Sequence, residues 1–156
     1  MPILYISLGL LLIAFIIYII LTIHHKKVSD HIKNTTQDLL KTYGELTHKH
    51  HHQYLNINNQ SYQILYFYVP VNAELTINSK IIWEIRDSSK SRLINQTSFL
   101  ASSDPKIIIV YPTTLSIKRF INENEMEFVN YHTMFNQMYV IRHFELEKLL
   151  QELKDA

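Results

Sequence analysis

The sequence predicts a single N-terminal transmembrane helix followed by one α/β domain, and three observations lead to this prediction. No charged side chain occurs from Met1 to Ile23. Two pairs of β-rich runs, each joined by turn residues, follow between Tyr54 and Arg86. Lys106–Tyr111 is a continuous run rich in β-branched residues, typical of a strand buried on both faces. At 156 residues, the chain has room for one domain beside the apolar segment.

The apolar segment is long enough for a membrane helix, which needs about 20 apolar residues. A cleaved signal peptide would have positive charge before its apolar core and small residues at the cleavage site. No Lys or Arg precedes Leu4, and residues 21–25 are Leu-Thr-Ile-His-His, a poor cleavage site. We therefore expect residues 1–25 to be an uncleaved anchor.

The flanking charges predict the orientation of this anchor. Lys26, Lys27 and Lys33 all follow it, and no basic residue precedes it. Because Lys and Arg near a membrane helix stay on the cytoplasmic side, residues 26–156 are expected to be a cytoplasmic domain at the cell membrane. The lipid bilayer is then the first expected partner.

The composition excludes several kinds of chemistry. The chain has no cysteine, so disulfides, thiol nucleophiles and cysteine metal sites are excluded. It has two glycines, Gly9 and Gly44, so it contains no glycine-rich phosphate-binding loop. We therefore expect no nucleotide cofactor. The net charge of +1 gives no general attraction to nucleic acid, and any such binding would need a local basic patch.

Apolar residues at helical spacing predict an amphipathic helix from Ser29 to His48. This helix is either a stalk that pairs with another copy or the first helix of the domain, and we favour the domain helix. The remaining elements are expected in the order of two hairpins, a helix, a strand, a helix, two strands and a helix, which predicts a three-layer α/β domain with a mixed sheet. The expected strands are 54–57 with 62–69, 74–77 with 81–86, 106–111, 127–129 and 139–142. The expected helices are 88–101, one that opens at 112–114, and 144–153.

The hairpin around Trp83 carries the main candidate site. Side chains alternate along a strand, so Glu84 and Arg86 share one face while Trp83 lies on the other, toward the core. On this pattern the chain resembles the restriction-endonuclease-like (PD-(D/E)XK) nuclease superfamily, over Ser29 to Tyr111. The family has a helix, a hairpin with one acid, a strand with acid-x-Lys, a helix and a hydrophobic strand.

In that family, two acids hold a divalent metal and the Lys orients or activates water. The resemblance places Glu84 at the acid of acid-x-Lys and Arg86 at the Lys, and the earlier acid falls on Asn78 or at Glu74. Arginine cannot act as a base, and Asn is a weaker metal ligand than a carboxylate. The resemblance therefore implies a degenerate nuclease-like domain without cleavage activity, and Mg²⁺ would be its metal only if it were active. The alternative that we favour is that Glu84 and Arg86 are simply the solvated face of a strand whose other face is core.

A second candidate site is the run His48-Lys49-His50-His51-His52. If the first helix continues through it, His48 and His52 lie one turn apart and can hold a transition metal; if a strand begins, His50 and His52 share a face. A solvated polar connector is the alternative that we favour.

Two classes of function follow. One is a membrane-tethered domain of nuclease-like fold that associates with nucleic acid through Lys80, Arg86, Lys90 and Arg92. The other is a non-enzymatic, membrane-tethered interaction module that binds a protein partner or a second copy, forming a homo-oligomer.

Overall fold

The structure, a computed structural model, describes residues 2–95 and 97–156, and all of their side chains except those of residues 2–6, 8 and 98. Met1 and Gln96, which fall within the predicted anchor and the predicted helix 88–101, lie outside the described residues. The chain divides into two compact units, residues 1–31 and residues 32–156. The predicted domain boundary between residues 25 and 26 lies within the first unit.

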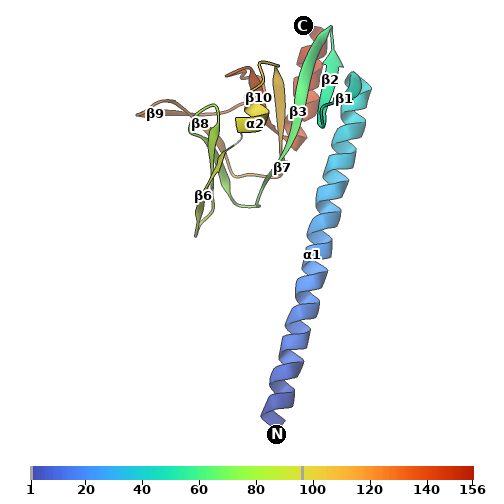
Figure 1. Cartoon of the computed structure of the whole chain (residues 1–156), viewed down its shortest axis with the longest axis vertical. Helices are drawn as coiled ribbons and strands as arrows, with labels where there is room; N and C mark the ends of the chain where they lie inside the picture. Colours follow the sequence, from blue (N-terminus) through green and yellow to red (C-terminus); the bar gives the residue numbers. More distant parts are fainter. Residues whose placement is uncertain (1, 96) are drawn as a thin grey trace. The chain divides into compact units, whose positions relative to one another are not determined.

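Helix α1 (Pro2–Tyr43) is one continuous helix (Figure 1). Among the described residues, it contains the one segment that is long and apolar enough to cross a membrane. The large apolar side chains between Leu10 and Ile23 are exposed. The prediction of one N-terminal apolar helix of membrane-spanning length is confirmed.

The predicted helix 29–48 is wrong at its C-terminal end, because α1 ends at Tyr43. The backbone N–H of Gly44 donates to the Leu40 carbonyl at 3.0 Å and closes the last turn. Strand β1 (Glu45–Lys49) begins directly afterwards and pairs along its whole length with β2 (His52–Ile57). Pairing with a neighbouring strand thus replaces the last helical turn that the polar sequence suggested.

Residues 32–156 form two five-stranded mixed sheets. The first sheet has the order β1-β2-β3-β7-β10, and the second has the order β6-β5-β4-β8-β9. The further strands are β3 (Gln60–Val69), β4 (Glu74–Ile77), β5 (Ile82–Arg86), β6 (Ser91–Asn95), β7 (Lys106–Pro112), β8 (Ile117–Asn122), β9 (Glu125–Phe128) and β10 (Met138–Arg142).

Both predicted hairpins are confirmed, since β2 pairs with β3 and β4 pairs with β5, each antiparallel. Asn58 and Asn59 connect β2 to β3 with φ values of 46° and 62°. Two consecutive residues with positive φ make the type I′ turn that matches the twist of a hairpin, and Asn tolerates this conformation well. His50 and His51 connect β1 to β2 in the same way, with φ values of 48° and 68°.

The prediction that β7 is a buried central strand is confirmed. It lies between β3 and β10 and is parallel to both. Ile107 and Ile109 belong to the apolar cluster on one face of the first sheet, and Ile108 and Val110 belong to the cluster on the other face. A strand buried on both faces needs this continuous apolar sequence.

Two predicted helices are wrong. The segment 88–101 contains the strand β6, which pairs antiparallel with β5, and among its described residues only α2 (Thr97–Leu100) is helical. The Asp87 carboxylate accepts hydrogen bonds from the backbone N–H groups of Ser89 and Lys90, so the polar run before β6 is a hairpin turn and not a helix start. Where a helix was predicted to open at 112–114, β7 ends at Pro112 and a loop over residues 113–116 leads to β8, which pairs in parallel with β4.

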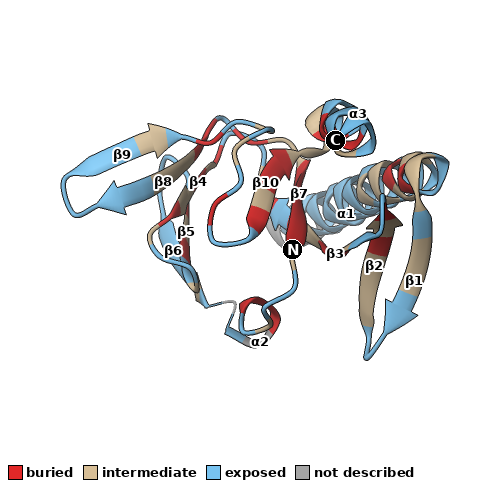
Figure 2. Cartoon of the chain, turned by 90° about the horizontal axis from the view of Figure 1, so that it is seen from above, coloured by how far each residue is buried: buried red, intermediate tan, exposed pale blue. Residues whose placement is uncertain are grey.

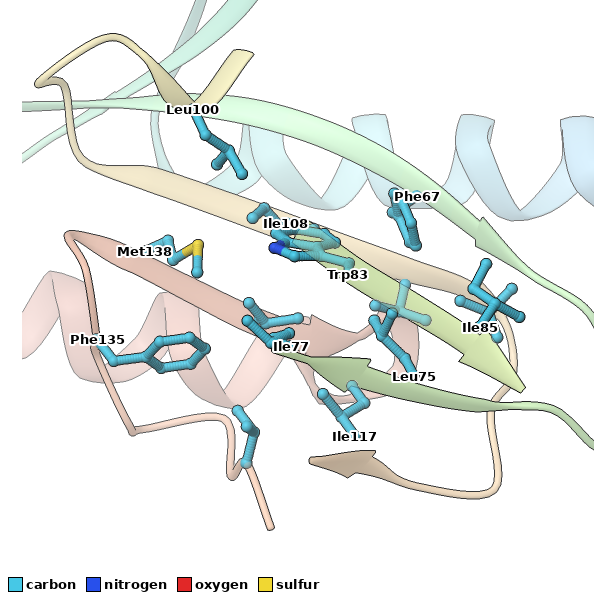
Figure 3. Close-up of a cluster of buried hydrophobic side chains, with 14 of the residues drawn as sticks. Phe67, Leu75, Ile77, Trp83, Ile85, Leu100, Ile108, Ile117, Phe135 and Met138 are labelled. Atoms are coloured by element: carbon cyan, nitrogen blue, oxygen red, sulfur yellow. The ribbon is translucent and has the colours of Figure 1, made fainter. Parts of the chain in front are cut away.

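The second unit has a helix layer, the first sheet and the second sheet (Figure 2). The two sheets pack face to face through the cluster around Trp83, whose ring lies 5.0 Å from that of Phe67 (Figure 3). On the other face of the first sheet, Leu40 of α1 packs beside α3 (Leu146–Asp155), which follows the short helix η1 (His143–Glu145). The predicted C-terminal helix is confirmed, and the mixed α/β domain contains two sheets.

Candidate functional site

The candidate residues Asn78, Glu84 and Arg86 lie on the outer face of the second sheet, the face directed away from the first sheet. Strand β5 directs Trp83 and Ile85 into the core between the sheets, so Glu84 and Arg86 face outward. The side chain of Asn78, just after β4, lies close enough to Glu84 to contribute to lowering its pKa. The structure thus brings the three residues together.

Other side chains already engage the carboxylate of Glu84. Its Oε1 accepts hydrogen bonds from Arg86 Nη2 at 2.9 Å, from Arg86 Nε at 3.2 Å and from the hydroxyl of Ser91. The hydrogen bonds from Ser91 and then Arg86 lower the pKa of Glu84, and the charge of Arg86 and the nearby Asn78 side chain add to this effect. Glu84 is therefore an ionised carboxylate fixed by its neighbours, which suits a structural ion pair better than an acid catalyst.

A second ion pair lies beside the first. Lys118 Nζ lies 3.0 Å from Glu74 Oε1, which also accepts a hydrogen bond from the Ser116 hydroxyl at 3.0 Å. Lys118 and then Ser116 lower the pKa of Glu74. The two ion pairs line a small cavity of about 110 Å³, and two acids and two bases leave its centre without net charge.

The arrangement offers little to a metal ion. The described part of the chain contains no group of three or more His, Asp or Glu side chains that could hold one. His48 lies in β1 opposite Gln53, and His52 lies in β2 opposite Lys49. The one-turn helical spacing of these two histidines is therefore not formed, because α1 has already ended.

The histidine run serves the local fold. The ring of His52 packs edge-on against Phe99, with the ring centroids 5.8 Å apart. His50 and His51 form the turn between β1 and β2. The alternative prediction required His50 and His52 to share a strand face. They do not, because His50 lies in the turn and His52 lies in β2.

Sequence reasoning missed the apolar border of this face. Large apolar side chains surround the two ion pairs and remain 41–67 % exposed. They come from four strands, and no helix follows β5 to cover them. They are Ile82, Leu93, Phe120, Met126 and Phe128. Leu93 and Ile94, an apolar pair between polar residues, were the available signal, but this pattern predicted one face of a helix.

Comparison of the chain with protein-family models, with curated proteins and with solved structures found no match. The resemblance to the restriction-endonuclease-like superfamily therefore rests on the sequence pattern around Glu84.

Proposed function

We propose that this protein is a single-pass membrane protein whose C-terminal domain faces the cytoplasm and acts as a non-enzymatic interaction module. The apolar part of α1 is the anchor, since it has the length and composition to span a bilayer. The basic residues that follow it, Lys26 and Lys27, favour the cytoplasmic orientation of the domain.

The outer face of the second sheet is the proposed binding surface, and its exposed apolar border is the observation that carries this proposal. Large exposed apolar side chains grouped on one face of a domain are typical of protein interaction sites. Leu93 and Phe128 are the most exposed of the border residues, at 65 % and 67 %. Both lie on edge strands of the sheet, so the border spans its whole width.

The proposed occupant is a second copy of the chain, because the charges on this face alternate. Strand register places Arg86 beside Glu74 in one row. In the next row, Glu84 lies beside Thr76, which lies beside Lys118. We consider a two-fold axis that lies between the two rows. A half-turn about this axis places Arg86 of one copy opposite Glu84 of the other, which is the reciprocal pairing that a two-fold interface requires. A common membrane anchor would also raise the local concentration of copies.

The test is the oligomeric state of the full chain in detergent micelles, measured by sedimentation equilibrium. We expect a dimer that Leu93→Asp weakens at least tenfold, because the substitution places a charge in the apolar border of the interface. Met134→Asp is the matched control, since Met134 is also exposed, at 44 %, but belongs to the loop between β9 and β10 and to no strand of the second sheet. It should leave the dimer unchanged.

Two results would contradict the proposal: a wild-type chain that stays monomeric at every accessible concentration, or a Leu93→Asp variant that dimerises as strongly as the wild type. Co-purification of nucleic acid that is lost steeply as salt rises would instead favour the nuclease-like alternative, because phosphate binding releases counterions.

A further inference from the structure

The carboxyl edge of the first sheet differs in chemistry from its amino edge. Strands β3, β7 and β10 are parallel, so their carboxyl ends lie together along one edge. Each of these strands is followed within a few residues by a large apolar side chain that is at least half exposed. These side chains are Val71 at 54 %, Leu115 at 62 % and Phe144 at 60 %.

The amino edge is polar by comparison. Each of the same three strands is preceded by a short polar segment. These segments are Asn58-Asn59 before β3, Ser102-Ser103-Asp104-Pro105 before β7 and Asn136-Gln137 before β10. The exposed apolar side chains are therefore not scattered evenly over the loops of this sheet.

Hydrogen bonds hold two of the apolar loops together. The Leu115 N–H donates to the Ala73 carbonyl at 3.0 Å, and the Thr114 hydroxyl donates to the same carbonyl at 2.7 Å. The Ala73 N–H in turn donates to the Pro70 carbonyl at 3.1 Å. The loops that carry Val71 and Leu115 thus form one connected surface.

The part of α1 that belongs to the second unit begins near this same edge. The unit begins at Ile32, and the ammonium of the next residue, Lys33, lies 5.2 Å from the centroid of the Tyr111 ring near the end of β7. Tyr111 packs against Tyr68, near the end of β3, with ring centroids 5.8 Å apart. The start of the second unit therefore lies near the edge with exposed apolar side chains.

We propose that this carboxyl edge is a second membrane contact, in which Val71, Leu115 and Phe144 enter the headgroup region of the bilayer that holds α1. The proposal rests on the membrane anchoring proposed above. Lys33 follows Ile23 by ten residues, and a helix of that length is about 15 Å long. The edge is therefore tethered close to the bilayer surface.

The chemistry of the edge matches this occupant. Apolar side chains at the ends of loops partition into the boundary between headgroups and acyl chains, about 5–10 Å deep. Tyrosine is enriched at the same depth, and Tyr68 is 48 % exposed here. Such a contact would fix the orientation of the domain on the membrane, which a helix alone leaves free to rotate.

The test uses the full chain in phosphatidylcholine vesicles. Because the sequence contains no cysteine, single cysteines can be introduced and labelled without background labelling of native thiols. A fluorophore at Leu115→Cys or Phe144→Cys should be quenched several-fold more strongly by a headgroup-attached nitroxide than one at Ser103→Cys. Ser103 is exposed and lies in the polar segment before β7, so it is the matched control for Leu115.

A further variant separates failure of this inference from failure of the anchor. Leu12→Cys lies in the apolar segment and should be quenched by a nitroxide on the acyl chain. Quenching at Leu12 together with equal quenching at Ser103, Leu115 and Phe144 would overturn the inference and leave the anchor intact. No quenching at Leu12 would refute the anchor and, with it, this inference. Unchanged Trp83 emission in each variant would show that the domain remains folded.

Discussion

Replacing Ile108 with Asp is expected to abolish cooperative folding of residues 32–156. Ile108 is fully buried in β7 and lies in the apolar cluster between the two sheets. A carboxylate there would be buried without a partner, and it would remain so whichever rotamer it adopts. Burial of an unpaired charge is among the most destabilising single changes, at about 4 kcal/mol or more.

Urea unfolding of the full chain in detergent micelles, followed by fluorescence, measures this effect. Trp83 is the only tryptophan and is fully buried in the same cluster, so its emission reports on the folded core. Ile108→Val is the control and should cost only about 1 kcal/mol, because it removes one methyl group. A cooperative transition with an unchanged midpoint in Ile108→Asp would show that β7 is misplaced.

Replacing Gly44 with Ala is expected to destabilise the junction between α1 and β1. A Cβ atom at this position would lie 2.4 Å from the Asn56 carbonyl oxygen and 2.9 Å from Leu55 Cδ1. The oxygen belongs to the backbone of β2, so it cannot move aside by a change of rotamer. Overpacking of this kind costs about 1–3 kcal/mol, and we expect the upper part of that range.

The same urea titration checks the prediction, and Gly9→Ala is the matched control. Nothing lies within 4 Å of a Cβ atom at Gly9, and alanine favours a helix, so the midpoint should not fall. If Gly44→Ala unfolded at the same urea concentration as the wild type, the close packing of Gly44 against β2 would be contradicted.

The parts of the fold that the sequence predicts well are those whose local pattern favours only one kind of element. The β-branched residues of β7 have no helical spacing, and the apolar residues of α3 have no strand spacing, so both were predicted correctly. The hairpin of β2 and β3 was predicted from its Asn58-Asn59 turn.

The predictions of secondary structure failed where a short segment fits both helical and strand spacing. Leu93 and Ile94 were assigned to a helix because polar residues surround them, but pairing with β5 makes them part of a strand. Leu115, Ile117 and Phe120 were also assigned to a helix, whereas β8 is fixed by its parallel pairing with β4. Partners distant in the sequence decide both cases, and local spacing does not contain that information.

The candidate site was predicted only in part. Alternation along β5 correctly predicted that Glu84 and Arg86 share a face opposite Trp83. The second ion pair was not predicted, because Lys118 is 44 residues from Glu74 and was assigned to a helix. The second sheet that joins these residues could not be inferred from local patterns.

Chemical cross-linking at Leu93 in intact cells tests the central claim most directly, namely that an anchored, cytoplasmic domain pairs through its second sheet. In the full chain carrying Leu93→Cys, we expect a membrane-permeant bis-maleimide to produce a covalent dimer and a membrane-impermeant maleimide to leave the thiol unlabelled. Met134→Cys, in the loop between β9 and β10, should remain monomeric with both reagents. Labelling of Leu93→Cys by the impermeant reagent, or cross-linking no greater than that of Met134→Cys, would contradict the account.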